Sequence, residues 1–251
     1  MRRDTLPEIA SPPVESVTNA RPVSAALARL RGSEAGAGWC RLPFFRDGEA
    51  DRIAAELDGL CARGIPLAPP PDMVFRALEL TPLDRVKAVI LGQDPYPKAG
   101  DAHGLAFSYV GPKAVPASLR VIFRELCDDV GCPVPRGGDL TKWASQGVLL
   151  LNAALTTETG RSGAHEKLGW SALVDQVVAS VSAGRPAVAF LLWGAIARSR
   201  ASLVDGAKHL VLESGHPSPL NRARDFPGSR PFSRANDWLV RRGIPPVDWT
   251  L

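Results

Sequence analysis

The sequence predicts a single α/β domain built on a central four-stranded, mainly parallel sheet that is flanked by helices on both faces. Short, mostly apolar runs alternate along the chain with segments of helical spacing, a pattern typical of parallel sheets covered on both sides. A chain of 251 residues is long enough to bury the core of one such domain. The predicted strands, in chain order, are Val86–Leu91, Gly147–Leu151, Ala187–Leu192 and His209–Glu213.

The first 37 residues are predicted to form a flexible N-terminal tail, and residues 38–251 to form the folded domain. The tail is rich in proline, serine, alanine and glycine, and no aromatic residue occurs before Trp39. Segments of this composition bury too little apolar surface to offset the entropy of ordering the chain. At most a short helix is expected within the tail, near Ser24–Arg31.

Helices are predicted where apolar residues recur at helical spacing. Asp47 and Ser118 stand at the starts of two of these segments, where a side-chain oxygen would cap the first turn. The predicted helices are Asp47–Arg63, Met73–Leu80, Ser118–Val130, Asp139 to about Gly147, Ser171–Ser182, Ile196–Val204 and Ser233–Arg242.

Composition restricts the partners and the setting of the protein. A formal charge of +4 and a pI near 9.1 permit an anionic partner without requiring one. No apolar run approaches the roughly 18 residues of a membrane span, and the Arg2-Arg3 pair lacks the apolar segment of an export signal. We therefore expect a cytoplasmic protein with no membrane contact. The four cysteines lack metal-ligand spacing and are expected to be reduced thiols, mostly in the core: Cys40, Cys61, Cys127 and Cys132.

Each predicted strand runs into a turn marked by polar residues or glycine. In an open parallel sheet, ligands bind outside the carboxyl ends of the strands. Asp94, Asn152 and His216 follow three of these strands, so a carboxylate, an amide and an imidazole are expected on one rim. Taken singly, Asp94 and Asn152 are equally consistent with turn-forming residues, and His216 with a structural histidine. Together they predict a chemical site.

Two loops at this rim are stiffened by proline. Pro95 fixes the backbone between Asp94 and Tyr96, and two further prolines flank Ser218 in the segment His216–Leu220. Rigid loops lower the entropic cost of placing their side chains.

Three other side chains suit recognition of a base or a duplex. Asn152 carries a donor and an acceptor, and can pair with an imide edge. Phe107 either packs in the core or offers a ring for base stacking. Leu220, on a proline-rich loop beside Arg222 and Arg224, suits a wedge between stacked bases.

Together these segments resemble the family 1 uracil-DNA glycosylases. The resemblance covers roughly Trp39 to Trp238, and several segments match in order at compatible spacing. The matching segments are Val89–Tyr96, Ala102–Ser108, Leu149–Ala153, Leu155-Thr156, Phe190–Gly194 and His216–Leu220, with Arg230 and Phe232-Ser233 in the same register.

The resemblance implies an enzyme that flips uracil out of DNA and hydrolyses its N-glycosidic bond. It would release free uracil, leave an abasic site and so initiate base excision repair. Asp94 would activate or position the attacking water and stabilise a cationic sugar, as carboxylates do in glycoside hydrolysis. His216 would donate a hydrogen bond to uracil O2 as the base leaves as an anion.

The resemblance also assigns binding roles. Asn152 would read O4 and N3–H of uracil, Phe107 would stack on the base, and Tyr96 would occupy the space of a thymine methyl. Gln93 would add backbone contacts at the pocket. DNA binding would fall to Ser118, Gly194, Ser218, Leu220 and Arg224.

The implied partners are single- and double-stranded DNA containing uracil, and a proteinaceous glycosylase inhibitor. A monomer without metal or other cofactor is expected. Two departures from the family pattern concern the grip on DNA: Pro97 replaces a common histidine and Ala195 a common serine. Their effect is expected on affinity for DNA, and not on the chemistry.

Three alternatives fit the same fold. A glycosylase that prefers thymine or mismatches is disfavoured by Tyr96 and Asn152, and an iron–sulfur relative by the spacing of the cysteines. A non-catalytic DNA-binding module would have no need of Asp94 and His216.

Overall fold

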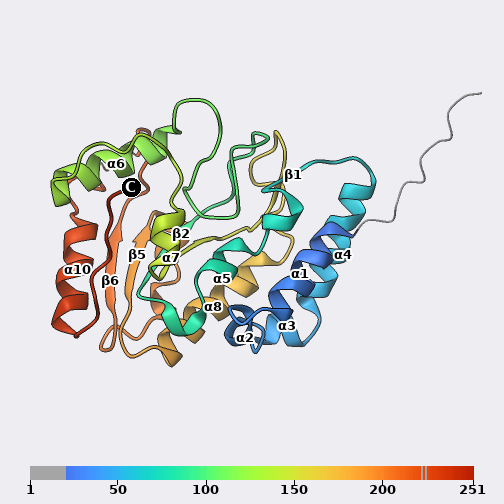
Figure 1. Cartoon of the computed structure of the whole chain (residues 1–251), viewed down its shortest axis with the longest axis horizontal. Coiled ribbons are helices and arrows are strands. Elements are labelled where there is room, and N and C mark those ends of the chain that lie inside the picture. The colour runs from blue at the N-terminus through green and yellow to red at the C-terminus, as the bar shows by residue number, and fades with distance from the viewer. Residues whose placement is uncertain (1–20, 222, 224) are drawn as a thin grey trace, which may run out of the picture.

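A computed structural model describes residues 21–221, 223 and 225–251 of the chain (Figure 1). Its centre is a sheet of four parallel strands in the order β3-β2-β5-β6. This confirms the predicted fold class, and each strand lies within two residues of its predicted bounds. The strands are β2 (Ala88–Gly92), β3 (Val148–Asn152), β5 (Ala189–Trp193) and β6 (Leu210–Ser214).

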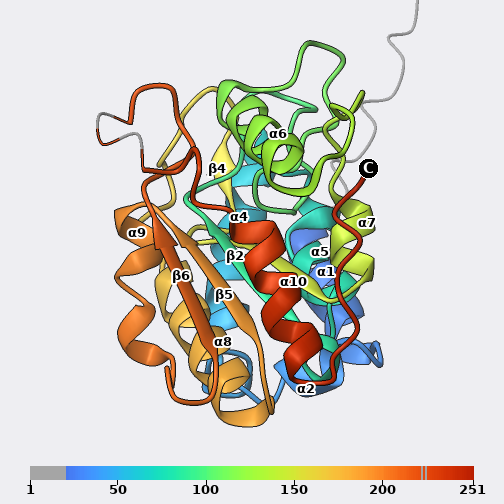
Figure 2. The same cartoon turned by 90° about the vertical axis from the view of Figure 1, so that its left-hand side faces the viewer.

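The sheet is covered by helices on both faces. The views in Figures 1 and 2 show α10 on one face and α8 on the other, while α1 to α4 cluster on the side of the molecule away from α10 in Figure 1. A two-stranded antiparallel pair, β1 (Leu67–Ala68) and β4 (Thr157–Glu158), lies among the loops. The α-helices of the described residues are α1 (Pro22–Gly32), α2 (Gly36–Trp39), α3 (Pro43–Arg46), α4 (Glu49–Ala62), α5 (Arg76–Leu80), α6 (Ala117–Val130), α7 (Thr141–Ser145), α8 (Trp170–Gly184), α9 (Ala195–Arg198) and α10 (Pro231–Arg241).

The strand register sets the position of the loops. Gly92 is paired with Asn152 and Trp193 with Ser214, so the carboxyl ends of all four strands meet at one edge. The three strands β2, β3 and β5 are buried along their whole length, which matches their apolar sequences.

The prediction of a flexible tail over residues 1–37 is wrong from residue 21 onward, although the short helix expected near Ser24–Arg31 is present as α1; residues 1–20 lie outside the described part of the chain. Val23, Leu27 and Leu30 of α1 are fully buried in the core. The buried Asp58 carboxylate on α4 accepts hydrogen bonds from the Val23 and Ser24 amides at 2.8 and 3.2 Å. Alanine and proline dilute the apolar stripe of α1, and the composition therefore understated its burial.

The two predicted helix caps are also wrong. Helix α4 begins after Gly48, whose φ of 91° starts the helix without a side-chain cap, and Asp47 instead pairs with Arg46 at 2.9 Å. Helix α6 begins after Pro116, so Ser118 lies inside its first turn. Pro116 precedes the helix with an extended backbone (ψ of 157°), and the Ser118 side chain, which lies at the Tyr96 hydroxyl, does not cap the helix.

All four cysteines are free thiols, but they are half-buried and not core residues as expected. The Sγ atoms of Cys127 and Cys132 lie 4.0 Å apart at the end of α6. Across residues 21–221, 223 and 225–251, no three histidine, cysteine or carboxylate side chains gather as metal ligands would. None of the helices in the same part of the chain is long and apolar enough to cross a membrane.

Candidate active site

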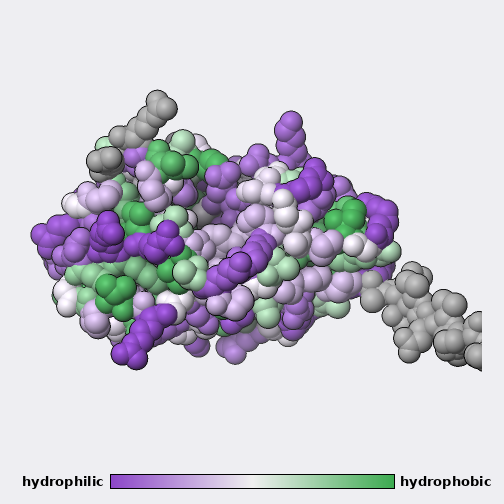
Figure 3. All heavy atoms as spheres, turned by 90° about the horizontal axis from the view of Figure 1, so that it is seen from above, coloured by the Kyte–Doolittle hydropathy of each residue, from purple (hydrophilic) through white to green (hydrophobic). Residues whose placement is uncertain are grey.

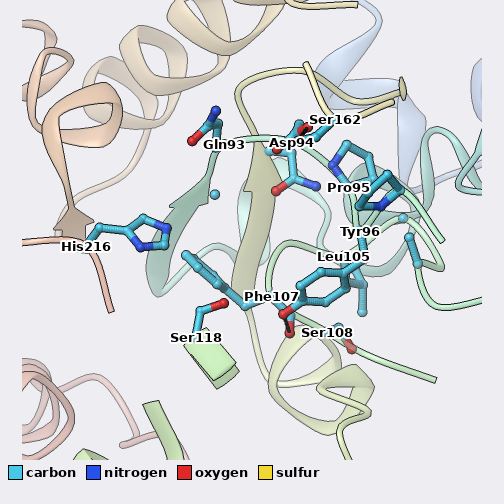
Figure 4. Close-up of a pocket in the computed structure, with 15 residues that line it drawn as sticks. Gln93, Asp94, Pro95, Tyr96, Leu105, Phe107, Ser108, Ser118, Ser162 and His216 are labelled. Carbon is cyan, nitrogen blue, oxygen red and sulfur yellow. Dashed lines mark hydrogen bonds between the residues drawn. The ribbon is translucent and has the colours of Figure 1, made fainter. Parts of the chain in front are cut away.

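A pocket of about 200 Å³ lies at the carboxyl edge of the sheet (Figure 4). It is formed by the turns after β2 and β3, the loop after β6, the start of α6 and the segment between β4 and α8. Most of the residues predicted for the site line it together: Gln93, Asp94, Tyr96, Phe107, Ser118, Asn152 and His216.

The remaining predicted residues lie around the pocket. Gly194 borders an adjoining hollow that shares Gln93 and His216 with it. Ser218 and Leu220 belong to the loop beyond His216, and the Leu220 side chain is 88% exposed. Arg224 lies outside the described residues. Seen from above, this face carries projecting hydrophilic side chains with apolar spots between them (Figure 3).

The floor of the pocket comes from the paired ends of β2 and β3. A Cβ atom on Gly92 would stand 2.2 Å from Oδ1 of Asn152, so only glycine lets this amide lie across the strand end. The pairing continues past the strands, since the Ala153 and Ala154 amides donate to the Gly92 and Gln93 carbonyls at 3.0 and 2.9 Å. The buried Asn152 side chain therefore packs against the end of β2, whose backbone is held to that of β3.

The Asp94 carboxylate is held by the segment that follows β4. Its Oδ2 atom accepts hydrogen bonds from the Ser162 hydroxyl at 2.6 Å and from the Gly163 amide at 2.8 Å. Sequence reasoning missed Ser162, which lies in a loop that follows no strand of the parallel sheet. Figure 4 shows Ser162 beside Asp94, across the pocket from Ser118.

Aromatic rings form the wall of the pocket. The Tyr96 hydroxyl donates to the Phe107 carbonyl at 3.0 Å, and burial raises the pKa of Tyr96, which keeps this donor protonated. Phe107 has a φ of 61°, a left-handed conformation rarely adopted by bulky residues. Its ring lies 5.8 Å from that of Trp193 and 5.9 Å from that of His216, so the strained backbone aims it at the pocket.

His216 faces this wall from the loop after β6. Burial lowers the pKa of His216, so its imidazole is neutral at pH 7 and carries one N–H donor. Gly194, with a φ of 87°, lies directly behind it: a Cβ atom there would approach the His216 Cβ to 3.0 Å. The glycine therefore admits the histidine to its position.

The chain returning from the Leu220 loop is fastened to α6 by two buried carboxylates. Glu125 accepts hydrogen bonds from the Gly228 and Arg230 amides at 2.6 and 2.8 Å. Asp129 accepts from the Phe232 and Ser233 amides at 2.9 and 2.8 Å. The same helix carries Ser118 at its first turn, so α6 joins the pocket wall to this loop.

His103, a buried histidine, supports the wall from behind. His103 Nε2 lies 2.5 Å from the Ser108 hydroxyl, which also accepts the Leu140 amide at 2.8 Å. Burial lowers the pKa of His103 to about 4, although Asp139 opposes this at 3.8 Å. The segment that bears Phe107 is thus anchored through a neutral imidazole.

Known proteins of one family resemble this chain. A family model described as the Uracil DNA glycosylase superfamily matches residues 79–240. A uracil-DNA glycosylase from Azotobacter vinelandii is 50% identical over 190 residues, which cover 76% of this chain and 82% of that protein. Another from Xanthomonas axonopodis is 48% identical over 213 residues, covering 85% and 86%. A crystal structure of the mimivirus UNG Y322L in complex with UGI aligns with a TM-score of 0.81 at 27% identity, over 90% of this chain and 91% of that one.

The low pKa of His103 predicts a loss of stability in mild acid. Between its ordinary value of 6.5 and about 4, the unfolded chain holds a proton on His103 that the folded chain lacks. The free energy of unfolding should therefore fall as pH drops through this window, by roughly 1.4 kcal/mol per pH unit for this histidine. Urea unfolding at pH 7, 6 and 5 measures it. His103→Gln should flatten the dependence, and equal slopes in the two proteins would contradict the prediction.

Proposed function

This chain belongs to the uracil DNA glycosylase superfamily, and from that premise we propose how its pocket removes uracil from DNA. The protein hydrolyses the N-glycosidic bond of uracil in DNA, which releases the base, leaves an abasic site and begins base excision repair. The observation that supports the proposed mechanism best is the convergence of Asp94, Asn152 and His216 on one pocket walled by Phe107.

Asp94 serves the sugar and the water. Departure of uracil leaves positive charge on the deoxyribose, and a carboxylate beside it stabilises that charge. With Oδ2 engaged by Ser162 and Gly163, Oδ1 has no hydrogen-bond partner among the described residues. Oδ1 is therefore the oxygen that faces the sugar and orients the attacking water.

His216 serves the leaving base. Among the described residues neither ring nitrogen of His216 forms a hydrogen bond, so its one N–H is available to a ligand. Negative charge grows on uracil O2 as the bond breaks, and a neutral donor placed there stabilises it in the transition state. A neutral imidazole, already present at pH 7, needs no proton uptake before the reaction.

The other pocket residues select the base. Asn152 offers a donor to O4 and an acceptor to N3–H, and cytosine presents the opposite pattern. The Phe107 ring stacks on the flipped base, and Gln93 contributes backbone contacts at the pocket. The Tyr96 ring, fixed by its hydrogen bond to Phe107, fills the space of a methyl at C5. This ring favours uracil over thymine and so speaks against a thymine-specific or mismatch-specific enzyme.

The rim binds the DNA strand. Ser118 in the pocket, Gly194 in the adjoining hollow and Ser218 on the loop beyond His216 contact phosphates, with Arg224 adding charge. Leu220 fills the gap in the duplex after flipping, since an exposed apolar side chain gains burial only against bases. Pro97 and Ala195 supply no side-chain donor. The affinity for DNA is therefore lower than in relatives that carry the common histidine and serine at these positions.

The proposal extends to the oligomeric state, the strandedness of the substrate, the cellular compartment and an inhibitor. The enzyme acts as a monomer on single- and double-stranded DNA, since Asp94, Asn152 and His216 of one chain line one pocket. It works in the cytoplasm, where the thiols of its four free cysteines stay reduced. A proteinaceous inhibitor is a further partner, since the mimivirus neighbour was solved in complex with UGI. The steps above use protein groups and water alone.

The two catalytic assignments predict large losses of activity. Asp94→Asn should slow uracil release by about 10²–10⁴-fold, because the neutral amide cannot stabilise the cation or accept a proton. His216→Ala should cost about 10²–10³-fold, as expected for a lost donor to a developing anion. Single-turnover release from a uracil-containing oligonucleotide measures both. Glu213→Gln, an exposed change in β6 three residues before His216, is the control. Full activity in Asp94→Asn or in His216→Ala would refute the assignment.

Base selection depends on the Tyr96 ring. Tyr96→Ala should open the space of the C5 methyl and give measurable thymine release, while uracil release falls because the hydrogen bond to Phe107 is lost. Tyr96→Phe keeps the ring and removes only the hydroxyl, so it should remain selective. Oligonucleotides that differ only in uracil, thymine or cytosine at one position test the pair. If Tyr96→Ala still releases no thymine, another group excludes the methyl.

The wedge role of Leu220 predicts an effect confined to duplex substrate. Leu220→Ala should slow release from duplex DNA by an amount that corresponds to roughly 1–3 kcal/mol of lost apolar burial, and should leave single-stranded substrate almost unaffected. The folded protein should keep its melting temperature, because the side chain is 88% exposed. An unchanged ratio of duplex to single-strand rates would show that Leu220 does not enter the duplex.

A further inference from the structure

We propose that Ser162 is a positioning residue that fixes the Asp94 carboxylate for reaction, an inference that rests on the proposed role of Asp94. Its hydroxyl donates to Oδ2 at 2.6 Å, and the adjacent Gly163 amide donates to the same oxygen at 2.8 Å. Among the residues that the structure describes, Ser162 is the only side chain that donates to Asp94. It lines the pocket wall beside the carboxylate (Figure 4).

The loop that carries Ser162 is fastened to the loop that carries Asp94. The Gly160 amide donates to the Pro97 carbonyl at 2.8 Å, only three residues beyond Asp94 in the chain. The Thr159 amide donates to the Pro66 carbonyl at 2.8 Å on the other side. A backbone hydrogen bond therefore joins the two loops close to the contact between Ser162 and Asp94.

The far end of the same loop is anchored in the core. The Thr156 hydroxyl lies 2.9 Å from Nδ1 of His165 and accepts the Trp170 indole N–H at 2.9 Å. His165 and Trp170 are both buried. An exposed serine in a loop held at both ends has little freedom to leave its partner, and the entropic cost of making the hydrogen bond is correspondingly small.

Glycine at position 163 gives the second donor its direction. Its φ of 75° lies in the left-handed region, and a Cβ atom there would meet the Glu166 carboxylate at 2.9 Å. This conformation turns the Gly163 amide toward the same oxygen that Ser162 binds. Two donors on one carboxylate oxygen leave the other oxygen to the substrate, and they fix the rotation of a side chain that is otherwise half exposed to water.

A fixed carboxylate reaches the sugar and the water in one orientation only. Catalytic groups lose much of their effect when they are displaced by about 1 Å, and losses near 10²-fold are known for such shifts. Ser162 should therefore act on the rate of the chemical step, while binding of DNA, which depends on other residues, should be preserved.

Ser162→Ala tests the inference in the full-length protein. The single-turnover rate of uracil release from single-stranded oligonucleotide should slow by about 10- to 100-fold, because a hydrogen bond to a charged group is lost. The KM from steady-state assays should stay within about twofold of the unmodified protein. Ser162→Thr keeps the hydroxyl and should retain most of the rate. Ser145→Ala, an exposed serine on α7 that bonds only a backbone carbonyl, is the matched control and should match the unmodified protein.

A double-mutant cycle separates positioning from a general structural effect. In Asp94→Asn protein the added Ser162→Ala change should have little further effect, since Ser162 acts through that carboxylate. A wild-type rate in Ser162→Ala, or a loss of the same size in both backgrounds, would overturn the inference. If Asp94→Asn alone keeps full activity, the proposed function of Asp94 fails first. If only Asp94→Asn is slow, the mechanism stands and Ser162 has no part in it.

Discussion

The parallel pairing of β2 with β3 and β5 is the constraint on which the site depends. Backbone hydrogen bonds fix this register, and it places Gly92, Asn152 and Trp193 at one edge. Because the three strands are buried on both faces, a slip of the register would leave buried backbone groups without partners. Residues more than a hundred positions apart can therefore form one pocket, and no side chain of the pocket has to hold the strands together.

The loops carry the side chains that react with and bind the substrate, and the backbone conformation of the loops sets the positions of these side chains. Pro95 stiffens the turn that bears Asp94, Gly194 clears space for His216, and Phe107 is held in a left-handed conformation between Trp193 and His216. The His103 and Ser108 contact behind Phe107 stabilises that strained segment. The site is in this way pre-formed, and its strain is balanced by the buried network around it.

The sequence was most informative where a side chain follows a strand. Asp94, Asn152 and His216 could be predicted as neighbours, because the end of a parallel strand has a known place in the fold. Ser162 could not, since its place depends on the hydrogen bond between Gly160 and Pro97 and on the distant anchor in α8.

The amino-acid composition of residues 21–37 gave a wrong prediction of a flexible tail for a similar reason. The stripe of α1 is made largely of alanine and isolated larger residues, so the segment resembles a tail until Asp58 and the core are in place to receive it. Helix starts were misjudged because backbone geometry at Gly48 and Pro116, and no side-chain oxygen, begins α4 and α6. Local patterns predicted elements well, and contacts distant in sequence decided the rest.

Helix α6 has a consequence for how this enzyme can evolve. Its first turn presents Ser118 to the pocket, and its last turns hold the returning chain through Glu125 and Asp129. A substitution that tilts the helix therefore changes the fit of the base and the approach of the duplex in the same step. Changes along α6 are therefore limited by the pocket and by the returning chain together, and adaptation to a different DNA substrate has to preserve both contacts of this one helix.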